Sequence, residues 1–176
     1  MIFLPQNKSY NIFILTVFQS QKNCELRIIL KFEGQTYYAQ YSTFKLAGSA
    51  QDYQLTIGGY SGTAGDALLD MGQDSPNGLP FSTFDRDNDN SKRNCAKFLR
   101  TGWWMNNCTK ANLNGVWNGT QKGGGVMWFP LTGYDKSVEY TEMKVRTSPN
   151  VNINLKRLRT TAFDVHGELT LRKIAI

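Results

Sequence analysis

The segment 81–90 holds the residue types best suited to chemistry, because Asp85, Asp87 and Asp89 occupy alternate positions in it. Three carboxylates so close together repel one another unless a cation lies among them. Calcium takes several oxygen ligands, and a loop offers both carboxylates and backbone carbonyl groups. The spacing therefore favours a calcium loop. The alternative is a solvated turn in which an aspartate side chain caps the backbone.

This loop does not follow the EF-hand pattern. The sixth position, which requires Gly in an EF-hand, is Asn90, and the twelfth, which requires Glu, is Ala96. No convincing helix is predicted on either side. If the loop binds calcium, its ligands occupy positions in the sequence other than those of an EF-hand.

The chain has three cysteines, Cys24, Cys95 and Cys108. Cys95 and Cys108 are the candidate pair, and closing a loop of that size would contribute about 3 kcal/mol. Cys24 is then free, or paired outside this chain. The alternative is three buried thiols in a cytosolic protein, where disulfides are rare. The cysteines have no companion His or second Cys pair at zinc spacing, so a zinc site is not predicted.

The sequence lacks a recognisable catalytic set. His166 is the only histidine, which leaves a Ser-His-Asp or Cys-His arrangement without support. The glycine run 123–125 precedes a strand-like segment and not a helix, so it is not predicted to hold phosphate. The carboxylates of 85–89 are too crowded for one to have a selectively raised pKa. We therefore expect a protein that is not an enzyme.

The formal net charge of +6 raises the question of nucleic-acid binding. Much of that charge lies near the C-terminus, while the body of the chain is close to balanced, so nucleic acid is not an expected partner. The cations near the C-terminus are Lys156, Arg157, Arg159, Arg172 and Lys173. The apolar run 12–18 is too short to span a bilayer, so no membrane span is expected.

Alternating hydrophobic and polar residues predict strands over 25–32, 36–44, 53–57 and 140–146, with shorter strand character at 127–129 and 169–176. The stretch 61–125 is punctuated by Gly, Asn, Asp and Pro, and a loop region of this length is uncommon unless it is functional. A short helix is expected over 64–71. The tryptophans and Tyr134 are either core residues or a ligand-stacking wall, and core is the more usual role.

Several short motifs now occur in a characteristic order: 58–66 (GGYSGTAGD), 81–90 (FSTFDRDNDN), 94–96 (NCA), 102–104 (GWW), 112–115 (NLNG) and 142–146 (EMKVR). This set resembles the fibrinogen C-terminal domain family, shared by fibrinogen chains, ficolins, tachylectins, angiopoietins and tenascins. The resemblance implies an α+β fold: a twisted antiparallel sheet, few short helices, and a long loop-rich subdomain for calcium and ligand.

The resemblance covers about residues 25 to 147. It divides the chain into an atypical N-terminal segment (1–24), a partial fibrinogen C-terminal-like domain (25–147) and an atypical basic tail (148–176). The family's N-terminal subdomain has no counterpart here. One face of the sheet is then expected to be uncovered, which predicts self-association into a homo-oligomer.

By position, the family's calcium site implies the carboxylates of Asp87 and Asp89 and the backbone carbonyls of Ser91 and Arg93 as ligands. Asp85 is then a neighbour. The family's disulfide corresponds to Cys95–Cys108. The peptide bond that enters the second cysteine is often cis in the family, and here it joins Asn107 to Cys108.

The implied ligand-binding residues are Asn107, Cys108, Thr109, Lys122, Gly123 and Tyr134. Three positions depart from the lectin members of the family. Thr109 replaces a histidine, Lys122 replaces an aromatic residue of the acetyl pocket, and Leu99 replaces a tyrosine. Tyr134 is retained. The scaffold of the pocket is therefore expected, with much of its lining changed.

The resemblance implies a secreted, calcium-binding recognition module with lectin-like binding of carbohydrate or acetylated surface ligands, of the innate-immune type. The expected partner is a carbohydrate or a cell-surface glycoprotein. The alternative is an extracellular protein-interaction module of angiopoietin-like or matrix type, in which the glycan pocket has degraded.

Overall fold

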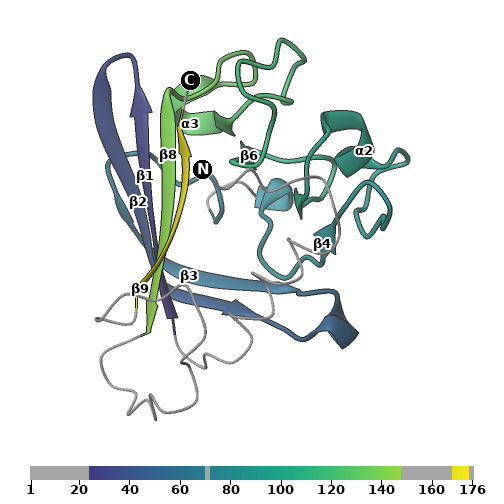
Figure 1. Ribbon diagram of the computed structural model, residues 1–176. Helices are drawn as coiled ribbons and strands as arrows, with labels where there is room; N and C mark the ends of the chain where they lie inside the picture. Colours follow the sequence, from purple (N-terminus) through teal and green to yellow (C-terminus); the bar gives the residue numbers. More distant parts are fainter. Residues whose placement is uncertain (1–23, 70–71, 148–167, 175–176) are drawn as a thin grey trace.

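The structure is a computed structural model that describes residues 24–69, 72–147 and 168–174 (Figure 1). Five antiparallel strands form one sheet in the order β3-β2-β1-β8-β9. They are β1 (Cys24–Phe32), β2 (Gln35–Leu46), β3 (Leu55–Gly62), β8 (Tyr140–Thr147) and β9 (Glu168–Ile174). The intervening residues form a loop-rich subdomain that lies to one side of this sheet. The expected α+β architecture with a twisted antiparallel sheet is confirmed.

The β1–β2 hairpin follows from its sequence pattern. Leu26, Ile28 and Leu30 are buried, whereas the residues between and after them are more exposed, so one face of β1 lies in the core. The two residues of the turn, Glu33 and Gly34, both have positive φ. This conformation gives a two-residue hairpin turn whose twist matches that of the paired strands.

Two other strands lie where the sequence predicted them, and β3 is longer than predicted. The predicted strands over 36–44 and 140–146 are confirmed as β2 and β8. β3 continues past the Gly58-Gly59 pair where an end was expected. Gly59 has a φ of 67°, and a Cβ at this position would clash with the Ser42 side chain. A glycine therefore allows the strand to continue past this point.

The short helix expected over 64–71 is absent from the described residues 64–69, which form bends. The Asp66 carboxylate explains the difference. Its Oδ1 atom accepts hydrogen bonds of 2.9 Å from the amides of both Leu68 and Leu69, and 2.8 Å from the Tyr41 hydroxyl. A side chain that binds local amides in this way competes with helical hydrogen bonding. Short 3₁₀ turns, η1 (Ser49–Gln51) and η2 (Gly72–Asp74), flank this region on either side.

The loop-rich subdomain contains only very short elements. Two-residue strands pair as β4 (Phe81–Ser82) with β5 (Trp103–Trp104), and as β6 (Ala111–Asn112) with β7 (Met127–Trp128). Two short helices, α2 (Cys95–Leu99) and α3 (Phe129–Thr132), complete it.

The tryptophan pair and Trp128 lie in the core and do not form an open wall. Trp103 and Trp104 are buried edge to face, with ring centroids 5.3 Å apart. The indole nitrogens of Trp104 and Trp128 donate 2.9 Å hydrogen bonds to the carbonyls of Tyr53 and Gly65. These bonds attach the subdomain to the segments that flank β3.

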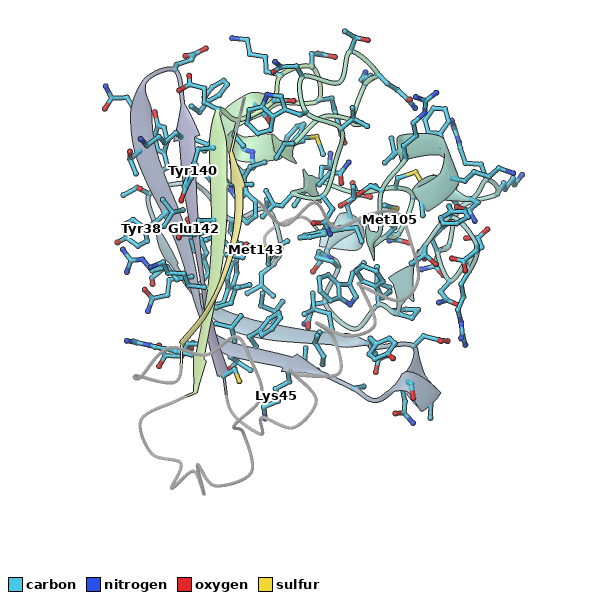
Figure 2. The ribbon with its side chains drawn as sticks, in the orientation of Figure 1. Tyr38, Lys45, Met105, Tyr140, Glu142 and Met143 are labelled. Atoms are coloured by element: carbon cyan, nitrogen blue, oxygen red, sulfur yellow. A yellow bond between two sulfur atoms is a disulfide. The ribbon has the colours of Figure 1, made fainter. Side chains whose placement is uncertain are left out.

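The two faces of the sheet differ. Met143 lies on the face toward the loop-rich subdomain and packs against the core, while Tyr38 and Glu142 lie on the opposite face (Figure 2). Arg27 stacks on Tyr38 on this outer face, with 4.5 Å from Cζ to the ring centroid. Within the described part of the chain, none of the helices has the length and apolarity that a bilayer crossing requires.

β9 pairs with β8 along its whole length, so the alternating segment near the C-terminus adds a fifth strand to the sheet. The N-terminal segment up to residue 23, His166 and the cations at 156–159 lie outside the described residues. The division of the chain into three segments stays a prediction.

Candidate functional site

The predicted calcium loop lies between β4 and α2. Asp87 is exposed and Asp89 is half-buried. The Asp89 amide donates to Asp87 Oδ1 at 3.4 Å, and the two carboxyl groups are close enough to interact. Within the described part of the chain, the carbonyls of Ser91 and Arg93 accept no backbone hydrogen bond. The four predicted donors are therefore two carboxylates, which also accept hydrogen bonds from loop amides, and two carbonyls that accept no backbone hydrogen bond.

Asp89 is the fixed point of this loop. Its Oδ1 atom accepts from the Ser91 amide at 2.9 Å and its Oδ2 atom accepts from the Cys95 amide at 2.8 Å. Burial, together with the nearby charge of Asp87, nevertheless raises the pKa of Asp89 above its ordinary value. A carboxylate with two oxygens has lone pairs to spare for a cation, and a cation would offset both unfavourable effects. The donor set fits calcium, which would supply charge neutralisation and cross-linking of the loop.

Asp85 has a different environment. Its carboxylate accepts a 2.7 Å hydrogen bond from the Thr83 hydroxyl in the turn that precedes the loop. The neighbouring Asn88 amide and side chain bind the Ser82 hydroxyl and the Phe81 carbonyl, at 3.1 and 2.7 Å. These bonds hold the start of the loop against β4, and the role of Asp85 as a neighbour of the calcium ligands stays a prediction.

The predicted Cys95–Cys108 disulfide is confirmed, with a Cα–Cα distance of 5.6 Å. The peptide bond between Asn107 and Cys108 is cis, as the resemblance implied. Beside it, Asn90 of the calcium loop donates through Nδ2 to Asn106 Oδ1 at 2.9 Å. Cys24 is a buried free thiol, so the odd cysteine does not pair within the described residues.

The predicted ligand residues Lys122, Gly123 and Tyr134 come together in the structure. The Gly123 amide donates to the Tyr134 carbonyl at 2.8 Å. The Lys122 ammonium lies 5.5 Å from the centroid of the Tyr134 ring. The ring itself packs against Phe129, with centroids 4.8 Å apart. We call Tyr134, Phe129 and the lysines around them the Tyr134 site.

A second lysine, which the sequence did not single out, completes the Tyr134 site. Lys110 Nζ lies 4.3 Å from the Phe129 centroid and 4.9 Å from the Tyr134 centroid. It also lies 3.6 Å from the Asp74 carboxylate. Its interaction with the Tyr134 side chain, and then with Asp74, raises the pKa of Lys110 above its ordinary value against a smaller opposing effect of burial. Lys110 is therefore a firmly charged ammonium at an aromatic surface.

The remaining predicted ligand residues, Asn107, Cys108 and Thr109, differ in their exposure to solvent. Asn107 is exposed and Cys108 half-buried. Thr109 is buried, and its hydroxyl exchanges hydrogen bonds with the backbone of Ala111 at 2.7 and 3.2 Å. Thr109 therefore faces the interior and supports β6, at the position where the family resemblance implied a histidine.

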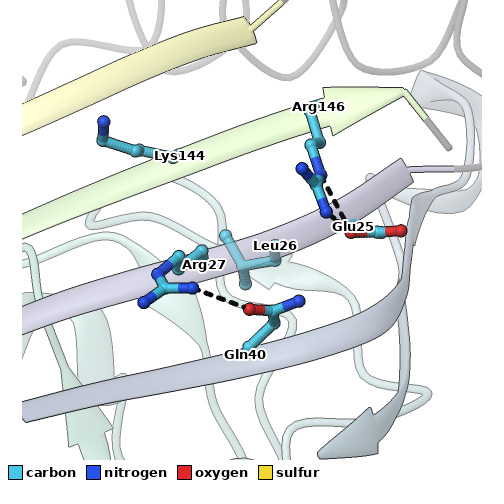
Figure 3. Close-up of a pocket in the computed structure, with 6 residues that line it drawn as sticks. All are labelled: Glu25, Leu26, Arg27, Gln40, Lys144 and Arg146. Carbon is cyan, nitrogen blue, oxygen red and sulfur yellow. Dashed lines mark hydrogen bonds and ion pairs between the residues drawn. The ribbon is translucent and has the colours of Figure 1, made fainter. Parts of the chain in front are cut away.

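The outer face of the sheet has a shallow hollow lined by polar side chains of β1, β2 and β8 (Figure 3). In it Arg146 donates to Glu25 Oε2 at 2.8 Å through Nη2, and Arg27 donates to Gln40 Oε1 at 3.0 Å. Four of the polar side chains in this hollow thus bind one another in two pairs. It is separate from the calcium loop and from the Tyr134 site.

Residues 11–148 match the family described as fibrinogen beta and gamma chains, C-terminal globular domain. The chain belongs to this family. The fibrinogen-related domain is 39% identical to tenascin of Gallus gallus over 140 residues, which is 80% of this chain and 8% of tenascin. It is 39% identical to fibrinogen-like protein 1 of Mus musculus over 168 residues, 85% of this chain and 52% of that protein.

Solved structures of similar fold include the fibrinogen-like globe domain of human ANGPTL6. It has a TM-score of 0.70 and 34% identity, and the match covers 76% of this chain and 62% of that one. A lamprey fibrin D-dimer, in complex with the peptide ligand Gly-His-Arg-Pro-amide, has a TM-score of 0.69 and 28% identity, over 81% of this chain and 53% of that one. The fibrinogen-related domain thus spans about half, or less, of the length of the curated relatives described above.

Proposed function

We propose that this fibrinogen-related domain is an extracellular, calcium-binding recognition module that binds a protein partner at the Tyr134 site. Two lysine ammonium groups, Lys110 and Lys122, lie over the Tyr134 ring, and this is the observation that carries the proposal. The two ammonium groups replace the uncharged aromatic wall that would hold an acetyl methyl group, and aromatic side chains such as Tyr134 and Phe129 are enriched at protein–protein contacts.

The relatives support a binding role and not a catalytic one. They include tenascin and fibrinogen-like protein 1, and one relative of similar fold was solved with a bound peptide. Cys95–Cys108 is a disulfide, which supports secretion because such bonds persist in oxidising compartments. Calcium held by Asp87, Asp89, Ser91 and Arg93 would brace the segment that leads into α2.

Lectin-like binding of acetylated carbohydrate is the second candidate. Tyr134, the aromatic residue retained from the lectin pocket, favours it. Lys122 opposes it, because a charged and exposed side chain occupies the position of the second aromatic residue. The two candidates differ in what they require of the partner, so binding experiments separate them.

The test uses the biotinylated chain on cultured cells in calcium-containing buffer. We expect trypsin treatment of the cells to abolish binding, and N-glycosidase treatment or free N-acetylglucosamine to leave it unchanged. Tyr134→Ala should weaken binding at least about tenfold, as loss of an aromatic anchor does. Tyr38→Ala, on the outer face of the sheet, is the matched control. Competition by N-acetylglucosamine would contradict the proposal and favour the lectin.

A further inference from the structure

The sequence contains three acceptor triplets for N-linked glycosylation, in which Ser or Thr follows an Asn by two positions and the middle residue is not proline. They are 7–9 (NKS), 107–109 (NCT) and 118–120 (NGT). The first lies outside the described residues, whereas the structure describes the other two in full. A glycan is bulky and hydrophilic and requires a surface position, so the surroundings of these two triplets distinguish between them.

The triplet 107–109 is closed by the fold. Cys108 is half-buried and bonded to Cys95 in the disulfide. Thr109 is buried, and its hydroxyl donates to the Ala111 carbonyl at 2.7 Å and accepts from the Ala111 amide at 3.2 Å. Once the chain has folded, the hydroxyl that the acceptor triplet requires is therefore bound to the backbone of β6 and out of an enzyme's reach.

The triplet 118–120 lies in an exposed turn between β6 and β7. The Gly119 amide donates to the Val116 carbonyl at 3.1 Å, which closes a four-residue turn over 116–119. Asn118 is exposed and has a φ of 49° at the third position of this turn, where Gly or Asn is usual. Trp117 packs against the core. The turn is thus anchored by Trp117, while Asn118 faces solvent.

The turn accounts for Asn118 but not for Thr120. Thr120 lies outside the four residues of the turn, and its side chain is exposed. Among the described residues, neither the Asn118 side-chain amide nor the Thr120 hydroxyl has a hydrogen-bond partner. Both groups that a glycosyl transferase must reach are therefore open in the folded chain, in contrast to the other described triplet.

We propose that Asn118 is the acceptor of an N-linked glycan. Its Nδ2 atom forms a bond to the anomeric carbon of the first sugar of a lipid-pyrophosphate-linked oligosaccharide. The lipid pyrophosphate leaves with the electron pair of the broken C–O bond, and Nδ2 loses one proton, so the transfer needs neither oxidant nor reductant. The inference rests on the extracellular location proposed above, because the triplet is an acceptor only in a secreted chain.

The glycan would lie beside the Tyr134 site and over an exposed apolar side chain. Val116, which begins the turn, is 42% exposed, and its amide donates to the Gly124 carbonyl at 2.8 Å. The adjoining Gly123 donates to the Tyr134 carbonyl. A hydrophilic glycan on this turn would cover Val116 and restrict the directions from which a partner reaches the Tyr134 site.

The test expresses the whole chain in mammalian cells behind a cleavable signal peptide, and oxidation of the Cys95–Cys108 pair verifies its passage through the secretory pathway. Trypsin separates the two described triplets, because Lys110 lies between them. Peptide 101–110 then carries Asn107 and peptide 111–122 carries Asn118. Mass spectrometry should find the glycan on peptide 111–122 and none on peptide 101–110, and N-glycosidase should remove it.

Variants at Thr120 test the triplet without disturbing the turn. Thr120→Val removes only the hydroxyl and should abolish the glycan on peptide 111–122, whereas Thr120→Ser should retain it. Asn107→Gln, at the exposed acceptor of the closed triplet, is the matched control and should leave this glycopeptide unchanged.

A secreted, oxidised chain without a glycan at Asn118 would overturn the inference. A glycan that persists in Thr120→Val, or one found on Asn107 and not on Asn118, would also overturn it. A cytosolic location of the unfused chain would instead contradict the proposed function. The appended signal peptide keeps that failure separate from a failure at Asn118.

Discussion

The amide of Cys95 donates a 2.8 Å hydrogen bond to Asp89 Oδ2. One residue thus belongs both to the disulfide and to the predicted calcium loop. The disulfide fixes the start of α2, and the same backbone position orients the carboxylate that calcium would bind. The disulfide and the predicted calcium site are therefore linked through the backbone amide of Cys95.

The first prediction concerns calcium. At about 100 times its dissociation constant, calcium should stabilise the wild-type domain by about 2.7 kcal/mol. Asp87→Ala should lose most of this gain, because Asp87 is an exposed loop carboxylate with little structural role of its own. Thermal unfolding with calcium and with a chelator measures the difference. Asp85→Ala is the control and should respond like wild type. Equal calcium shifts in wild type and Asp87→Ala would sink the assignment.

The second prediction concerns the disulfide, whose cysteines are separated by 13 positions. Replacing Cys95 and Cys108 by serine should lower the free energy of unfolding by about 3 kcal/mol, since the unfolded chain is no longer constrained. Urea denaturation measures this. Reductant should destabilise wild type by a similar amount and leave the double variant unchanged. A variant as stable as wild type would mean that the loop is held by packing alone.

The third prediction concerns the pH dependence of Cys24. Burial raises the pKa of this thiol from 9.0 to about 11. The unfolded thiol loses its proton near its ordinary pKa while the folded one retains it, so the contribution to stability is full below pH 9 and falls as pH rises toward about 11. Cys24→Ala should flatten this part of the stability–pH profile. The folded thiol should also resist iodoacetamide near neutral pH, and rapid alkylation of native protein would contradict its burial.

The fourth prediction concerns Asn112, a fully buried polar residue of β6. Its Oδ1 atom accepts from the Thr101 hydroxyl at 2.9 Å, and its Nδ2 atom donates to the Gly123 carbonyl at 3.1 Å. Asn112→Ala should cost about 2–4 kcal/mol, because both partners are left buried and unsatisfied. Asn114→Ala removes one bond, to the Gly102 carbonyl at a half-buried position, and should cost less. The reverse order in chemical denaturation would contradict this account.

The sheet could be predicted from the sequence because hydrophobic residues recur at alternate positions along its long strands. Leu26, Ile28 and Leu30 on β1 face the core, and this alternation is a local signal. The edge strand β9 shows the same kind of alternation in sequence, but its pairing with β8 is determined by the tertiary structure. Hydrophobic period does not reveal which strand lies beside which.

Much of the loop-rich subdomain could not be predicted because side chains determine it. Helix α2 is too short for a helical period, and its start depends on the Asn94 side chain, which accepts from the Lys97 amide at 2.7 Å. Lys110 is distant in sequence from Phe129 and Tyr134, and it joins the Tyr134 site only through tertiary structure, in which the Phe129 amide donates to the Lys110 carbonyl at 2.9 Å. Cys95 and Cys108 were the candidate pair on sequence grounds, and the family resemblance implied the same disulfide. The calcium and ligand assignments made on that basis stay predictions.

The long-stranded sheet and the loop-rich subdomain should open to hydrogen exchange at different rates. Amides of β1 are enclosed between β2 and β8, so their hydrogen exchange requires opening of the sheet as a whole. Amides such as those of Ser91 and Cys95 are held by one aspartate side chain, and its release frees them with no strand separating. The domain should therefore unfold in two steps of unequal cost, with the recognition loops opening many times for each opening of the sheet.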